Sequence, residues 1–210
     1  MISEDNGFSL EEVKEIVALP DWKISNVYLY GSRVYGNFDH ASDYDFLVVA
    51  RSMDRDREIR FSKYNIHVHT PDKFEDDLRV YRMVNLECIF APSFAKAQEK
   101  IDYRAKLSMD DFKLKKSIFK QSHDSWLKSN MKFREMDIDR AVKSLFHSLR
   151  ILMFGIQIIK HGEIVNFSEA NGYWDEISKM EEFKWNIFKD RFLPIKRELE
   201  EGLMDAKEQI

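Results

Sequence analysis

Residues 29–36, which read LYGSRVYG, and residues 42–47, which read SDYDFL, decide how this chain folds. The first stretch is the end of an apolar strand that runs into a Gly-Ser turn, and the second opens another apolar strand. Gly31 lets the backbone approach a bulky ligand, and Ser32 adds a short hydroxyl donor. We expect the turn to enter a helix, whose first amides and dipole favour phosphate.

The second stretch carries two carboxylates, on Asp43 and Asp45. Residues two apart on a strand project from the same face, so these side chains lie next to each other. Paired hard oxygen ligands suit Mg²⁺, which binds through one or two carboxylates plus substrate phosphates. Each motif alone is common, and Asp43 could simply cap a turn. Together, a phosphate-binding turn and a carboxylate pair predict a phosphoryl-transfer site.

The rest of the chain divides into a mixed half and a helical half. Before residue 98, strand patterns at 27–30, 44–50 and 64–70 alternate with helical ones, and Pro71 opens a helix. After residue 105 the patterns are helical, with the clearest helix predicted at 137–161, and Pro194 predicts a break or a kink in the last helix. No Gly/Ser linker separates the halves.

Composition excludes several classes of protein. With 44% hydrophobic residues and 16 Phe, the chain can build a core, so it is not intrinsically disordered. The single cysteine, Cys88, excludes a disulfide scaffold and agrees with a reducing compartment. The uncharged apolar runs are much shorter than the roughly 20 residues of a bilayer span. We therefore expect a cytoplasmic protein with no membrane partner.

Charge is unevenly distributed along a chain whose formal net charge is −4. Residues 104–134 hold nine Lys or Arg against three Asp, whereas residues 163–210 hold twelve acids against seven bases. The basic segment could be an ordinary solvated helix face, or it could bind an anionic partner such as RNA.

The two motifs together resemble the nucleotidyltransferase superfamily with the DNA polymerase β-like catalytic fold. That family has a Gly-Ser turn followed, some ten residues later, by Asp-x-Asp. Gly31, Ser32, Asp43 and Asp45 match this pattern, and Arg33 and Gly36 match its extended form in small bacterial and phage members. The resemblance covers roughly residues 10–95. It implies an α+β fold, with a small mixed-sheet nucleotidyltransferase domain at 1–98 followed by an all-helical domain at 105–210.

The resemblance also implies an activity. Family members move a nucleoside monophosphate from an NTP, here expected to be ATP, to a hydroxyl acceptor. Gly31, Ser32, Arg33 and Gly36 would bind the nucleotide, and Asp43 and Asp45 would hold one or two Mg²⁺ ions. The acceptor could be a small molecule, a protein or an RNA, the last bound through residues 104–134.

The sequence departs from the family at the third carboxylate, which usually lies on the neighbouring strand. That strand reads YNIHVHT at 64–70 and places Asn65, His67 and His69 on one face. His67 could act as general base, or Asp72 or Glu87 could supply the missing acid. Alternatively, the protein is a catalytically degenerate nucleotide or RNA binder. A protein-nucleotidylating, antitoxin-like role is a further alternative.

Overall fold

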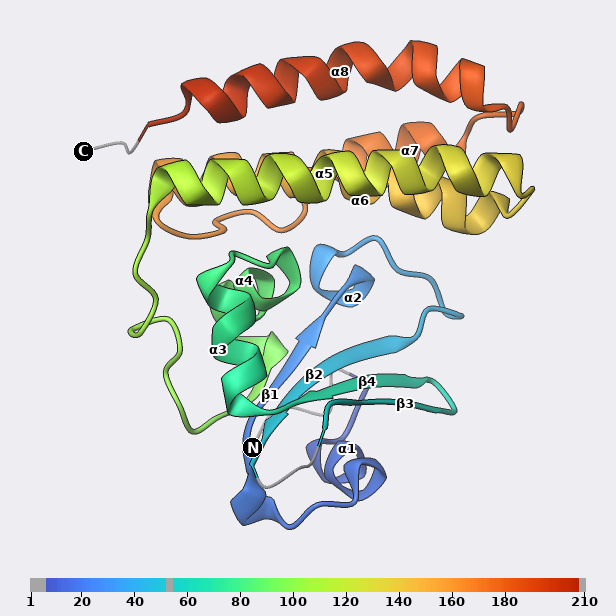
Figure 1. Ribbon diagram of the computed structural model, residues 1–210. Coiled ribbons are helices and arrows are strands. Elements are labelled where there is room, and N and C mark those ends of the chain that lie inside the picture. Colours follow the sequence, from blue (N-terminus) through green and yellow to red (C-terminus); the bar gives the residue numbers. More distant parts are fainter. Residues whose placement is uncertain (1–6, 52–54, 208–210) are drawn as a thin grey trace. The chain divides into compact units, whose positions relative to one another are not determined.

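The computed structural model describes residues 7–51 and 55–207, and the chain divides into two compact units, Met1–Ser108 and Met109–Ile210 (Figure 1). Unit 1 contains five strands and several short helices. In chain order these are α1 (Leu10–Val17), η2 (Asp21–Lys23), β1 (Ile24–Tyr30), α2 (Ser32–Tyr35), β2 (Tyr44–Ala50), β3 (Arg57–Phe61), β4 (Tyr64–His69), α3 (Pro71–Arg79), α4 (Met83–Phe90), η3 (Ser93–Ala95) and β5 (Lys96–Glu99).

The five strands form one mixed sheet in the order β3-β4-β2-β1-β5. Strands β2 and β4 pair in parallel, and the other neighbouring pairs are antiparallel. The central strand β2 is almost entirely buried, as its apolar sequence predicts for a strand that is covered on both faces. This sheet, followed by a helical unit, confirms the α+β class.

Aromatic side chains fill both sides of the sheet. On the α1 side, the Phe8 ring meets the Phe46 ring edge-on, with centroids 4.9 Å apart. On the other side, Tyr28 of β1 stacks on Phe74 of α3, with ring centroids 6.0 Å apart. Because successive strand residues alternate between faces, Tyr30, Asp45 and Asn65 share the α3 face. The residues expected to carry the chemistry therefore lie on one side of the sheet.

Unit 2 consists of the helices α5 (Asp111–Arg134), α6 (Ile138–His161), α7 (Asn171–Ser178) and α8 (Trp185–Asp205). Helices α5 and α6 pack closely at Gly155 of α6. A Cβ at this position would lie only 2.6 Å from Cγ2 of Ile118 in α5. Helix α6 is long and apolar enough to cross a bilayer, but most of it is buried, as in the core helix of a globular unit. Helix α8 continues through the exposed Pro194, so of the predicted break or kink the break is wrong.

Candidate active site

The Gly-Ser turn begins where β1 ends at Tyr30. Gly31 adopts φ 81° and ψ −159°, a conformation that is open essentially only to glycine. The following helix, α2, is a single turn that ends at Gly36, which adopts the left-handed conformation with φ 81°. Such a short helix has little dipole, so the predicted dipole contribution is small. Gly31 provides no side-chain cap, which leaves the first amides of α2 uncapped by the preceding residue.

The Asp45 carboxylate lies directly against this turn. A Cβ placed on Gly31 would come within 2.7 Å of Asp45 Oδ2, so only glycine permits the approach. On its other side, Oδ1 of Asp45 accepts a hydrogen bond of 2.9 Å from Nδ2 of Asn65. The side chain is thus fixed between the turn and the neighbouring strand.

Arg33 holds the loop that carries Asp43. Its guanidinium donates to the backbone oxygens of Ser42, at 2.6 Å, and of Asp43, at 3.3 Å. The same group lies 3.6 Å from the centroid of the Tyr44 ring. In this structure Arg33 therefore positions the Asp43 loop, a role that the sequence did not suggest, and its predicted contact with nucleotide stays a prediction.

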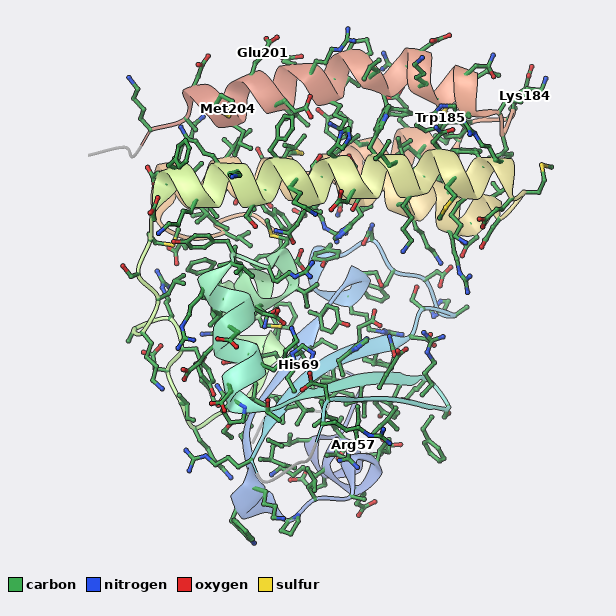
Figure 2. All side chains as sticks on the ribbon, viewed as in Figure 1. Arg57, His69, Lys184, Trp185, Glu201 and Met204 are labelled. Atoms are coloured by element: carbon green, nitrogen blue, oxygen red, sulfur yellow. The ribbon has the colours of Figure 1, made fainter. Side chains whose placement is uncertain are left out.

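Strand β4 supplies the polar side chains beside Asp45. In the parallel register Asn65 lies opposite Asp45, and His67 lies opposite Leu47. His67 is partly exposed, and its ring lies 6.4 Å from the ring of Tyr30, centroid to centroid. At the end of the row, His69 lies near α3, with Nδ1 3.9 Å from Asp77 Oδ2 (Figure 2). Asn65, rather than an acid, therefore occupies the position next to Asp45.

The pKa of Asp45 is raised above its ordinary value, mainly because the side chain is largely buried. The Asn65 hydrogen bond opposes this rise, the negative charge of Asp43 adds to it, and the nearby His67 opposes it. Two carboxylates that repel each other in a partly desolvated site favour a cation between them. The electrostatics therefore agree with the predicted metal pair.

The structure offers no third carboxylate from the two residues that the sequence suggested. Glu87 of α4 is buried, and its Oε2 accepts a hydrogen bond from the Tyr35 hydroxyl of α2. Asp72 is exposed in the first turn of α3. Across residues 7–51 and 55–207, no three His, Cys, Asp or Glu side chains gather into a metal-binding group.

The donor set nonetheless fits Mg²⁺ that is shared with a substrate. Asp43 and Asp45 supply two carboxylates, and the buried Oδ1 of Asn65 has no hydrogen-bond partner in the described part of the chain. All of these are hard oxygen donors, and Mg²⁺ commonly completes its coordination with water and phosphate oxygens. The site thus suits a metal that arrives with a polyphosphate.

Comparison with known proteins bears on this site. No match was found among curated proteins. The crystal structure of a nucleotidyltransferase-like protein from Exiguobacterium sibiricum 255-15 aligns with 95% of this chain and 74% of its own. The identity is 14% and the TM-score is 0.35, which is too low to establish a common arrangement of the whole chain.

A family model described as "Nucleotidyltransferase domain" matches residues 10–121, which is more than half of the chain. The match includes the Gly-Ser turn, the aspartate pair and strand β4. It agrees with the resemblance that the two motifs carry and with the mixed sheet that places them together. The chain belongs to the nucleotidyltransferase domain family.

Proposed function

We propose that the protein transfers a nucleoside monophosphate from an NTP to a hydroxyl acceptor in a Mg²⁺-dependent reaction. One observation carries the proposal: the Asp45 carboxylate lies against the Gly31 turn, so close that a Cβ would stand 2.7 Å from Oδ2. A metal carboxylate and a phosphate-binding turn thereby share one site. ATP is the first donor to test.

Each residue of the site has a proposed task. The turn at Gly31 and Ser32 binds the triphosphate, and Gly36 ends the single helical turn that follows. Asp43 and Asp45 hold Mg²⁺, which would neutralise charge on the phosphates and on the leaving pyrophosphate. Asn65 holds the Asp45 carboxylate in place through its amide.

His67 is the proposed general base. It lies on the same face as Asn65, one pleat further along β4, and it is partly exposed. A neutral imidazole nitrogen there would accept the proton of the acceptor hydroxyl as its oxygen attacks the α-phosphate. Glu58 lies opposite His67 on β3 and would stabilise the imidazolium that forms.

Nucleotide binding is the first test. Isothermal titration calorimetry with ATP and Mg²⁺ should show binding to the wild type and at least a tenfold loss in the Asp43→Asn, Asp45→Asn double variant. Asp76→Asn is the matched control, because Asp76 is an exposed carboxylate of α3 that pairs with Arg79. Unchanged affinity in the double variant with metal present would overturn the proposal.

Nucleotidyl transfer is the second test. It is needed because Asn65 in place of the usual acid also fits a protein that binds nucleotide without catalysing transfer. The purified protein, α-labelled NTPs, Mg²⁺ or Mn²⁺ and a cell extract should give a labelled product. His67→Gln should then lower kcat by about 10²–10⁴-fold with little change in the KM for NTP. Normal NTP binding with no labelled product and no pyrophosphate release would instead favour the degenerate binder.

A further inference from the structure

The exposed side of α5 carries an apolar stripe in addition to the side chains that build the core of unit 2. At the edge of this stripe, the centroid of the Phe119 ring lies 5.8 Å from Nζ of Lys196 in α8. The inward face packs Leu114, Ile118, Trp126 and Phe133 into the unit. The apolar side chains of the stripe are well exposed at Phe112 (76%), Phe119 (41%), Leu127 (50%) and Met131 (48%). Large apolar side chains gathered on one exposed helix face indicate a surface that binds something.

Basic residues lie beside this stripe: at about 3.6 residues per turn, Lys116 and Arg134 are about 60° around the helix from Phe119, whereas Lys128 is on the opposite side. The exposed charged residues of α5 comprise five cations and two carboxylates, namely Lys113, Lys116, Lys120, Lys128, Arg134, Asp111 and Asp124. Lys120 pairs with Asp124, and Lys113 pairs with Asp110, which precedes the helix. Within residues 7–51 and 55–207, Lys116, Lys128 and Arg134 make no ion pair. The stripe is therefore flanked by cations that can bind an anionic partner.

Two rings of this face stand parallel. Phe119 and His123 lie one helical turn apart, with centroids 6.5 Å apart and an angle of 4° between the ring planes. Exposed aromatic rings are surfaces on which the bases of a single strand stack, whatever the base. Phe119 and His123 are both exposed and therefore offer such surfaces.

We propose that the exposed face of α5 binds single-stranded nucleic acid, with bases stacked on Phe119 and His123 and phosphates on Lys116 and Arg134. Basic residues interleaved with aromatic rings suit a single strand, because its bases are open to stacking while its backbone is anionic. A duplex keeps its bases stacked inside and would leave the ring pair unused. If the bound strand is also the acceptor of the transfer reaction, the acceptor group is a nucleic-acid hydroxyl. Only this identification of the acceptor rests on the proposed function.

Fluorescence anisotropy with fluorescein-labelled 12-nucleotide oligouridine and oligothymidine, at low salt, tests the surface. The full-length wild type should bind, and Phe119→Ala or His123→Ala should weaken binding by roughly 5- to 150-fold, as removal of one stacking partner does. Lys116→Gln and Arg134→Gln should each lower the slope of log affinity against log salt by about 0.7. Phe61→Ala is the matched control, an exposed phenylalanine of β3 in unit 1 that should bind as the wild type does.

Several outcomes would overturn this assignment. These are no binding at low salt, equal binding of a hairpin duplex, or an equal loss in Phe61→Ala and Phe119→Ala. If Phe119→Ala instead abolishes a dimer seen by light scattering and leaves oligonucleotide binding unchanged, a second copy covers the face. Failure here is separable from failure of the proposed function, because Phe119→Ala should keep its affinity for Mg²⁺-ATP, and the Asp43→Asn, Asp45→Asn variant should keep oligonucleotide binding.

Discussion

Replacement of Gly31 by alanine should damage the fold and the site together. The backbone there adopts φ 81° and ψ −159°, which costs a non-glycine residue about 1–3 kcal/mol. The new Cβ would also stand 2.7 Å from Asp45 Oδ2, so the carboxylate must turn away and lose its hydrogen bond from Asn65. A hydrogen bond to a charged group contributes about 1.5–3 kcal/mol. Together these terms predict a loss of between about 2.5 and 6 kcal/mol for unit 1.

Differential scanning calorimetry measures this loss. At the lower figure, a unit of this size should unfold about 10–20 °C earlier, and Mg²⁺-dependent ATP binding should be lost with the displaced Asp45. Two other glycines calibrate the result. Gly162→Ala should cost only the left-handed backbone penalty of about 1–2 kcal/mol, because φ is 72° and nothing lies within 4 Å of its Cβ. Gly172→Ala, in helix α7 with open space around it, should be neutral or stabilising. If Gly31→Ala costs no more than Gly162→Ala and still binds ATP, the contact between turn and carboxylate does not have the role described.

Four further outcomes follow from the same contacts. Asp43→Asn should lower the pKa of Asp45, since it removes a like charge while burial continues to raise that pKa; a ¹³C NMR titration of the carboxyl reports it. Arg33→Ala should loosen the loop before Asp43, seen as faster amide hydrogen exchange there but not in β2. Asn65→Asp should destabilise the metal-free protein by like-charge repulsion and strengthen Mg²⁺ binding. The melting temperature without metal should therefore fall, while the Mg²⁺ affinity measured by calorimetric titration should rise. Gly155→Ala should destabilise unit 2 by about 1–3 kcal/mol through overpacking, measured by denaturant titration.

Much of the fold follows from local sequence signals. The buried strand at Tyr44–Ala50 and the helix at Ile138–His161 lie where their apolar patterns predict. Two edge strands, Arg57–Phe61 and Lys96–Glu99, were not predicted. Both are short and largely polar, and edge strands need no apolar alternation because one side of their backbone is solvated. These strands form because a neighbouring strand offers them hydrogen-bonding partners, and the local residue pattern carries no information about that neighbour.

Pro194 shows the same limitation in a helix. A proline removes one backbone hydrogen bond, and the sequence therefore predicts a break or a kink. The helix continues because Pro194 is exposed, so water can satisfy the unpaired carbonyl, while Phe188 and Phe192 bury the inner face on both turns before it. Tertiary packing outweighs the local penalty, and no pattern within the helix itself reports that packing.

The candidate site was predictable in its residue types but not in its contacts. The motif predicted that Gly31, Arg33 and Asp45 belong to one site, and the spacing of the two aspartates predicted that their side chains share one face. It did not reveal that the Arg33 guanidinium turns to backbone carbonyls, or that the Asn65 amide holds Asp45. Both contacts join segments that are nine or more residues apart, so they depend on the loop path and the sheet register.

This division of contacts bears on how the site would treat its substrate. Asp43 and Asp45 present two negative charges, and Asn65 offers only a neutral amide. A triphosphate that entered without a cation would therefore meet like charges at the turn. We expect NTP to bind well only when Mg²⁺ enters with it, because the metal cancels that repulsion. Nucleotide affinity should accordingly depend strongly on the presence of the metal.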